Sequence, residues 1–224
     1  DSAGGSAKKG RDKEFQAVLP LRGKILNTWE VDGGELFRSD TIHDIAVAIG
    51  VDPHAKDEKA DLRGLRYGKI CILSDADVDG SHIQVLLLTL FYRHFPQLIE
   101  KGHVFVAMPP LFRVDVPKRG KKAERKLYCL DDRELQRTLE QLRKEGFTDE
   151  QISISRFKGL GEMEAEQLAE TTLHPDTRRL LPVALGGVTE AVTHQVMNLL
   201  MGGNEANDRR RWMEVFGDAV ETDV

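Results

Sequence analysis

The sequence is poor in cysteine and has no long hydrophobic run. Two cysteines, Cys71 and Cys129, occur among the 224 residues, and no Cys-x-x-Cys pair is present. Both lie in predicted strands, so we expect buried free thiols of a cytosolic protein rather than a disulfide. The longest apolar stretch, residues 83–91, is too short to span a bilayer, and no signal peptide is recognisable. These absences argue against a disulfide-stapled secreted domain and against an integral membrane protein.

An excess of positive charge is also missing. Lys and Arg number 32 against 37 Asp and Glu, which gives a formal net charge of -5 at pH 7. A nucleic-acid-binding protein with this balance must concentrate its positive charge locally. Internal repeats, low-complexity segments and the Gly-Lys-Ser/Thr ending of a Walker A loop are absent as well. The length suits one large domain or two small ones, and the missing initial Met leads us to expect a fragment.

The most informative stretch is a short apolar run that ends in three alternating aspartates. Residues 69–73 predict a buried strand, and Asp75, Asp77 and Asp79 follow it. If the extended conformation persists, the three side chains project to one side, at the strand end where open parallel sheets bind ligands. Two carboxylates ~4 Å apart repel by about 4 kcal/mol at an effective dielectric constant of about 20. A bound cation would offset this repulsion.

The ligand types indicate which cation to expect. Hard carboxylate oxygens without His or Cys favour Mg²⁺. The spacing also matches the opening of an EF-hand calcium loop, but position 12 of that loop falls on Leu86 and no helix precedes it. A solvated acidic turn is the remaining alternative. We predict a metal site, with Mg²⁺ favoured over Ca²⁺.

Periodicity and turn residues predict an α/β fold. The predicted strands are residues 15–19, 69–73, 104–108, 111–116, 126–130 and 152–157, and the predicted helices are residues 40–49, 83–99, 131–145, 164–173, 190–200 and 204–216. The first three strands alternate with helices, which is typical of a parallel sheet. The next two form a hairpin with a basic tip, and Pro96 is expected to kink or end the second helix.

Two further segments combine glycine with charge. Arg22 and Lys24 bracket a glycine that lets the backbone approach a phosphate, and Asn27 can donate to a phosphate or a base edge. Lys158 opens a Lys-Gly-Leu-Gly-Glu loop, which is weak evidence for phosphate binding. A basic surface turn is the common alternative for the first segment. For His82, which follows the aspartates, a structural role is the common alternative.

Four segments together resemble the signatures of one family. They are residues 1–7 (DSAGGSA), 20–27 (PLRGKILN), 75–82 (DADVDGSH) and 156–163 (RFKGLGEM). In this order they are similar to the TOPRIM and adjoining motifs in the B subunits of type IIA DNA topoisomerases. The resemblance extends to about residue 180, and the ending Arg-Arg-Arg-Trp at 209–212 resembles topoisomerase IV more than gyrase.

The resemblance implies a fold and a domain organisation. It implies a TOPRIM Rossmann-like parallel sheet flanked by helices, followed by a mixed, mainly helical tail region. The expected domains are residues 1–116 (metal-binding TOPRIM domain), 117–150 (basic hairpin and connecting helix) and 151–224 (tail region). The family's first strand would lie upstream of Asp1 and would end at a metal-binding Glu, the proposed acid/base, two residues before Asp1. We therefore expect the fragment alone to be inactive.

The resemblance also implies a mechanism and partners. One or two Mg²⁺ ions would be held by Asp75 and Asp77, with Asp79 completing the catalytic set. The nucleophilic tyrosine would belong to the partner A subunit of a heterotetramer, in keeping with three tyrosines here that sit in no nucleophile motif. ATP would bind only to an N-terminal region upstream. The activity implied is ATP-dependent double-strand passage, which decatenates and relaxes DNA during chromosome segregation in the bacterial cytoplasm, with no membrane partner.

Individual binding roles follow the matched motifs. The family match assigns contacts with double-stranded DNA to Lys24, Asn27, His82 and Arg209. It places Asp1 and Arg22 near the pocket for quinolone-type drugs at the cleavage site. It places Lys158 beside the cleavage core, behind the groups that contact metal or DNA.

Two other interpretations stay open at this point. The chain could be a fragment of the gyrase B protein, which a supercoiling assay would distinguish from topoisomerase IV. It could also be a non-catalytic metal- and DNA-binding scaffold, because the first motif is truncated. Primases and small nucleases also use TOPRIM sites but lack the signature at residues 156–163.

Overall fold

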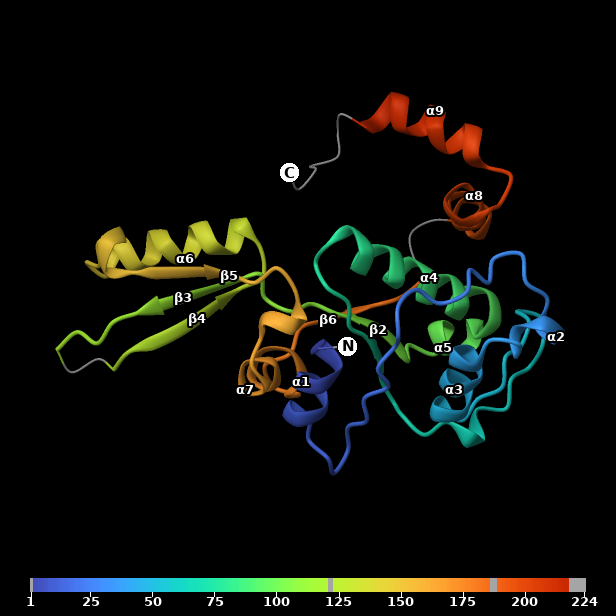
Figure 1. The fold of residues 1–224 in the computed structure, drawn as a ribbon, viewed down its shortest axis with the longest axis horizontal. Coiled ribbons are helices and arrows are strands. Elements are labelled where there is room, and N and C mark those ends of the chain that lie inside the picture. Colours follow the sequence, from blue (N-terminus) through green and yellow to red (C-terminus); the bar gives the residue numbers. More distant parts are fainter. Residues whose placement is uncertain (1, 121–122, 186–188, 218–224) are drawn as a thin grey trace. The chain divides into compact units, whose positions relative to one another are not determined.

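The computed structural model describes residues 2–120, 123–185 and 189–217. The chain divides into two compact units, each built from segments that are distant in sequence (Figure 1). The first unit comprises Asp1–Gly23, Cys71–Gln84 and Phe105–Leu181, and the second comprises Lys24–Ile70, Val85–Val104 and Pro182–Val224.

The regular structure of the described residues consists of helices and two small sheets. The helices are α1 Ser2–Gly10, α2 Gly33–Leu36, α3 Asp40–Ile49, α4 Val78–His94, α5 Pro96–Glu100, α6 Asp132–Lys144, α7 Ala165–Leu168, α8 Glu190–Met201 and α9 Ala206–Phe216. The strands are β1 Ile70–Ile72, β2 Val104–Ala107, β3 Phe112–Val116, β4 Arg125–Cys129, β5 Ser153–Arg156 and β6 Leu180–Pro182. One sheet has the order β1-β2-β6 with β1 and β2 parallel, and the other has the order β4-β3-β5. The predicted α/β class is confirmed.

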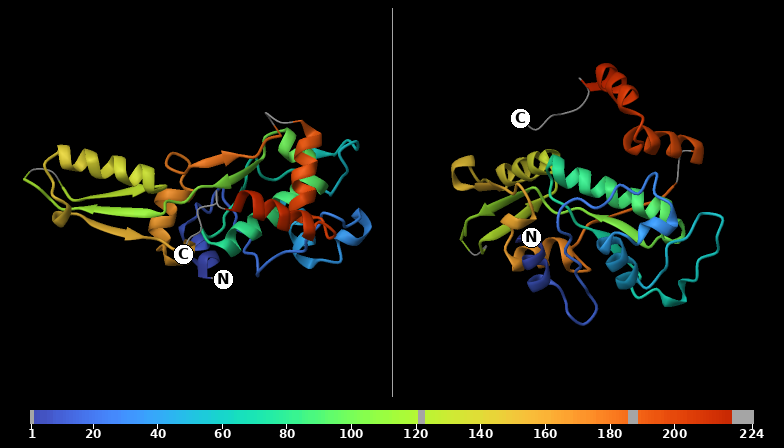
Figure 2. Two further views of the ribbon diagram at one scale, coloured as in Figure 1. Left: turned by 90° about the horizontal axis from the view of Figure 1, so that it is seen from above. Right: turned by 45° about the vertical axis from the view of Figure 1, so that its right-hand side comes forward.

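The β4-β3-β5 sheet and α6 form a separate core in the first unit. Both pairings are antiparallel, and Phe112 lies opposite Cys129 on one side and Arg156 on the other. Alternate β3 side chains are buried, and they pack with the apolar stripe of α6, which runs along the sheet (Figure 2). The α6 helix begins where the Asp131 carboxylate accepts a hydrogen bond from the Glu134 N–H at 2.8 Å. The predicted hairpin and helix are thus confirmed.

A second core in the first unit surrounds the loop at residues 157–163. Helices α1 and α7 lie side by side there, and their packing is supported by the following buried side chains: Ala7, Phe157, Leu160, Met163, Leu168 and Leu173. The α7 helix passes directly into a π-helix at Ala169–Leu173. The amino-terminal segment is helical from Ser2 to Gly10.

In the second unit, α3 has the predicted bounds, and its buried side chains are Ile42, Ile45, Ala46 and Ile49. Gly50 ends the helix with φ of 79°, a left-handed conformation that favours glycine. A β-carbon at this position would collide with the carbonyl oxygen of Gly64. The 62–66 segment can therefore pack directly on the end of α3, and the Arg66 N–H donates to the Ile49 carbonyl at 2.9 Å.

Trp29 is the main anchor between the loop before α2 and the helices of the second unit. Its side chain is 4% exposed, and its Nε1–H donates to Asn198 Oδ1 on α8 at 2.8 Å. Its ring stacks on Tyr92, with 6.1 Å between centroids, and the Arg93 guanidinium lies 5.4 Å from its centroid. Nearby, burial lowers the pKa of His94, whose Nε2 lies 3.2 Å from the Thr28 carbonyl oxygen.

Two predicted elements were wrong, and one strand was not predicted. Residues 15–19 are irregular, because Gln16 bonds the turn at Asp12 and the Leu173 carbonyl, and Phe15 is 53% exposed instead of packing in a sheet. The third strand beside β2 is instead β6, whose three residues are too few to show a periodicity. The helix predicted at residues 83–99 begins earlier and is broken at Phe95, so Pro96 starts a new helix at the position where its missing N–H does no harm.

Candidate functional site

The acidic motif turns sharply instead of continuing the strand. After β1 the chain is irregular, and α4 begins at Val78. The Asp77 Oδ1 atom accepts a hydrogen bond from the Gly80 N–H at 2.6 Å, as helix-capping aspartates do. Asp79 therefore lies in the first turn of the helix. The extended path that would place the three carboxylates on one side does not persist, because the Asp77 cap starts the helix early.

Asp75 is held from two directions. Its Oδ1 accepts a hydrogen bond from the Leu160 N–H at 2.8 Å, although 85 residues separate the two in sequence. On the other side, Gly80 packs against the Asp75 backbone so closely that a β-carbon would collide with it. The sequence therefore brings two of its signatures, the acidic motif and the Lys-Gly-Leu-Gly-Glu loop, into direct contact.

The donor chemistry of Asp75 and Asp77 fits a magnesium ion. Asp75 is half-buried, Asp77 is exposed, and the side-chain hydrogen bonds found for these two within the described residues use only Oδ1 of each. In the described part of the chain, no three His, Cys, Asp or Glu side chains are grouped closely enough to hold an ion. Mg²⁺ is commonly bound by one or two carboxylates and keeps several waters, so a pair of aspartates is sufficient for it.

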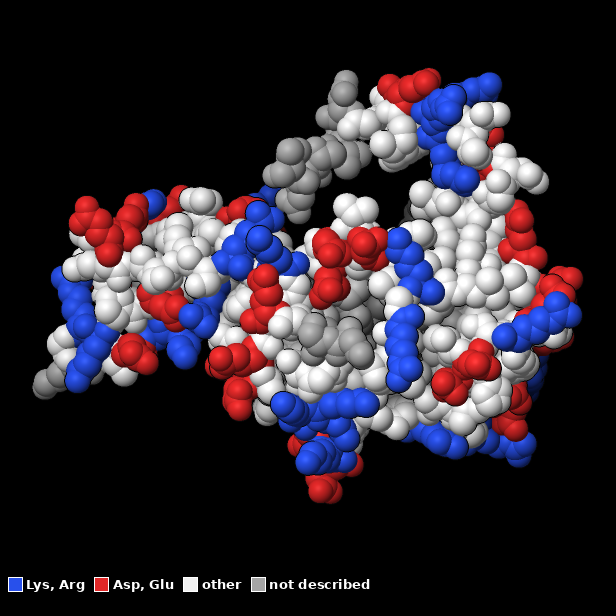
Figure 3. Space-filling view, in the orientation of Figure 1, with Lys and Arg blue, Asp and Glu red and all other residues white. Residues whose placement is uncertain are grey.

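The other predicted residues of the first unit lie on its surface. Arg22 is exposed in the irregular segment after Pro20, and His82 is exposed on α4. Lys158 has an exposed side chain, while its backbone N–H donates to Glu162 Oε2 at 2.8 Å. Asp1 lies outside the described residues. Figure 3 shows Lys and Arg in several separate groups on the visible face, with Asp and Glu interspersed among them.

Lys24, Asn27 and Arg209 lie in the second unit, and two of them bond to one helix end. The Asn27 Nδ2 donates to the Met201 carbonyl at 2.8 Å. One Arg209 nitrogen, Nη1, donates to the carbonyls of Leu199 and Gly202 at 3.0 and 2.8 Å. These bonds satisfy carbonyls at the carboxyl end of α8, where a helix leaves acceptors without partners. Asn27 and Arg209 thus have a structural role that sequence patterns did not indicate.

Sequence reasoning also missed the residues that support the site. Gly159 and Leu160 approach Asp75, and Gly80 packs on its backbone. The Lys-Gly-Leu-Gly-Glu loop stood out in the sequence because it combines glycine with a charged group. No local pattern could indicate which charged group it was, because the contact joins residues that are distant in sequence.

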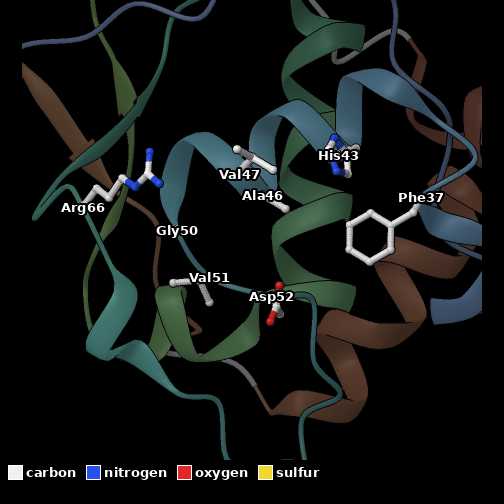
Figure 4. A pocket seen from close by; sticks show the side chains of 8 residues that line it. All are labelled: Phe37, His43, Ala46, Val47, Gly50, Val51, Asp52 and Arg66. Carbon is white, nitrogen blue, oxygen red and sulfur yellow. The ribbon is translucent and has the colours of Figure 1, made fainter.

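A shallow apolar pocket lies elsewhere, in the second unit (Figure 4). Its volume is about 470 Å³, and it is lined by Phe37, His43, Ala46, Val47, Gly50, Val51, Asp52 and Arg66. Four of these residues come from one face of α3 and its end. None of the site residues predicted from the sequence lines it.

Two protein families match the chain. Residues 1–109 match the Toprim domain, and residues 149–214 match the carboxyl terminus of the DNA gyrase B subunit. The chain thus contains a Toprim domain followed by a domain of the gyrase B carboxyl-terminal family. No helix in the described residues is long and apolar enough to cross a membrane.

Individual relatives of the chain are B subunits of DNA topoisomerase 4 and of DNA gyrase. The chain is 55% identical over 221 residues to the B subunit of DNA topoisomerase 4 from Pseudomonas aeruginosa, and 50% identical over 225 residues to that from Escherichia coli. It is 48% identical over 225 residues to the B subunit of DNA gyrase from Thermus thermophilus. These alignments cover 99–100% of this chain but only 33–34% of the relatives, so the chain spans about a third of their length. The chain is homologous to the B subunit of topoisomerase IV, a type II topoisomerase, and the family resemblance is confirmed.

Proposed function

We propose that the chain is the Mg²⁺-binding Toprim part of the DNA breakage–reunion core of topoisomerase IV. In this role it supports ATP-dependent double-strand passage together with a partner A subunit that carries the nucleophilic tyrosine. The observation that supports this most directly is the pair Asp75 and Asp77, fixed by hydrogen bonds directly after β1 within the segment that matches the Toprim domain. ATP would bind to a region outside this chain, and the assembly would act in the bacterial cytoplasm.

Asp75 and Asp77 would hold the ion, and Asp79 would add a carboxylate from the first turn of α4. When bound, Mg²⁺ supplies stabilisation of the charge on the transferring phosphate and the departing oxygen. The protein's own contribution is to keep these carboxylates in place: the Gly80 N–H holds Asp77, and the Leu160 N–H holds Asp75. Neither bond depends on an ion or on DNA, so the two bonds can hold the ligands in position for the ion.

Lys24 and His82 would bind the DNA backbone through charge and hydrogen bonds. For Asn27 and Arg209 we propose DNA contacts in addition to their bonds at the end of α8. Lys158 would act from beside the cleavage core, and Asp1 and Arg22 would border the quinolone-type drug site. We further propose domains at residues 1–116, 117–150 and 151–224.

A gyrase assignment is the second candidate, because a gyrase B protein is 48% identical to this chain. The test uses the full-length protein assembled with its partner A subunit, in the presence of ATP. Topoisomerase IV is expected to decatenate linked DNA circles and to relax supercoils without introducing negative ones. Introduction of negative supercoils would favour gyrase. Absence of both activities, with Mg²⁺ and DNA still bound, would favour the scaffold interpretation.

The Lys24→Ala variant is expected to bind double-stranded DNA more weakly, and by about the same factor whatever the DNA sequence. The logarithm of the binding constant falls as the logarithm of the salt concentration rises, and loss of one phosphate contact makes this negative slope shallower by about 0.9. Fluorescence anisotropy with a labelled duplex at several salt concentrations measures this slope. Lys59→Ala, which removes an exposed lysine of the same unit, is the matched control. Equal slopes for the two variants would contradict a phosphate contact at Lys24.

A further inference from the structure

The loop at residues 158–162 contacts the acidic motif, although the two segments match different protein families. Asp75 belongs to the Toprim match at residues 1–109, whereas this loop belongs to the carboxyl-terminal match at residues 149–214. Both lie in the first unit, and the Leu160 N–H bonds the Asp75 carboxylate. We propose that the loop is a clamp that positions Asp75 for ion binding, with Gly159 and the Leu160 amide as its positioning groups. The inference rests on the proposed Mg²⁺ role of Asp75.

Position 159 requires glycine because it lies close to the Asp75 side chain, and not because of its backbone conformation. Its φ of -171° is extended, a conformation that any residue adopts. A β-carbon on Gly159, however, would lie 2.8 Å from Oδ1 and 2.9 Å from Cγ of Asp75. Only a residue without a side chain lets the 159–160 peptide approach the carboxylate. A methyl group here would push Asp75 away from the Leu160 N–H.

The clamp is rigid enough to hold a side chain in place. Glu162 Oε2 accepts from the Lys158 N–H at 2.8 Å, and the Glu162 N–H donates to the Gly159 carbonyl at 3.1 Å. The apolar members of the loop, Leu160 and Met163, are 5% and 2% exposed and pack in the α1–α7 core. The Leu160 amide is thereby fixed by its own buried side chain. A metal ligand oriented by such a partner loses less freedom when the ion binds.

Two substitutions at Leu160 separate the amide from the side chain. Leu160→Pro removes the N–H and the leucine side chain, whereas Leu160→Ala removes the side chain and keeps the N–H. Proline fits the backbone here, because Leu160 is the first residue of a short helical turn and Gly159 before it is extended. In calorimetric titration of the chain with Mg²⁺, we expect Leu160→Pro to bind about tenfold or more weakly than Leu160→Ala, the scale for losing a group that orients a metal ligand.

Gly159→Ala tests the closeness argument. It is expected to weaken Mg²⁺ binding by a similar factor, while Gly68→Ala, at a position with open space around it, leaves the affinity unchanged. Thermal unfolding of each variant shows whether the fold is retained. Equal Mg²⁺ affinities for the proline and alanine variants at residue 160 would overturn the clamp.

Hydrogen exchange tests the clamp without any ion. The Leu160 amide is expected to exchange at least about tenfold faster in Asp75→Ala than in the unsubstituted chain, because its acceptor is lost. Asp77→Ala, which removes the neighbouring carboxylate, is expected to leave that amide protected. Unchanged exchange in Asp75→Ala would overturn the clamp even if Mg²⁺ binds. If the clamp amide behaves as expected but neither the chain nor Asp75→Asn binds Mg²⁺, the proposed metal role fails instead.

Discussion

Asp75→Asn is expected to reduce Mg²⁺-dependent DNA cleavage to background in the assembled enzyme while leaving the fold intact. The asparagine keeps Oδ1 and can still accept the Leu160 N–H, so the contact across the first unit survives. What is lost is the negative charge that the ion requires. A metal contributes several kcal/mol of charge stabilisation to phosphoryl transfer, so we expect a decrease of about a hundredfold or more.

The measurement is the amount of protein-linked DNA formed at a series of Mg²⁺ concentrations, with the full-length protein and its tyrosine-bearing partner. Asp176→Asn is the matched control, since it removes an exposed carboxylate of the same unit that only approaches His174 at 4.0 Å. The control is expected to cleave normally. Cleavage by Asp75→Asn at the level of the control would disprove a catalytic role for this residue.

Trp29→Ala is expected to destabilise the second unit by about 3–5 kcal/mol, the usual cost of removing a buried aromatic side chain. The ring is almost fully buried and holds the loop that carries Lys24 and Asn27 against α8. Its loss removes the packing against Tyr92 and His194 together with the bond to Asn198. Urea unfolding followed by circular dichroism measures the change.

Trp29→Phe separates the two contributions of this side chain. It keeps an aromatic ring and loses the hydrogen bond, which is worth about 0.5–1.5 kcal/mol. We therefore expect the phenylalanine variant to lie much closer to the unsubstituted chain than the alanine variant. If alanine costs less than the phenylalanine substitution, Trp29 does not anchor this unit.

Elements with clear end signals were predictable from the sequence. The bounds of α3 follow from its buried stripe and from Gly50, and α6 follows from Asp131 and its leucines. The segment at residues 15–19 misled because apolar residues in a short run do not say whether a sheet edge is available for them. The start of α4 was misplaced because Asp77 was interpreted as a ligand and not also as a helix cap.

The residue types of the candidate site were recognisable from the sequence, but the bonds that position them were not. Three aspartates after a strand indicate a cation, and this requires no knowledge of the rest of the chain. The positions of the Asp77 and Asp75 carboxylates depend on bonds from Gly80 and Leu160, respectively, and Leu160 is 85 residues away from Asp75. Likewise, nothing local to Asn27 or Arg209 indicates that both bond to the end of α8.

The contact between Asp75 and Leu160 also bears on the order of events during synthesis. A ribosome that has added Asp75 must still add 85 residues before the partner of Asp75 exists. Until then the carboxylate has no amide to hold it, and closing so long a loop is slow compared with forming α4. The nascent chain therefore makes its strand, its turn and its helix first. It acquires an ordered acidic site late, close to the time when the first unit as a whole is complete.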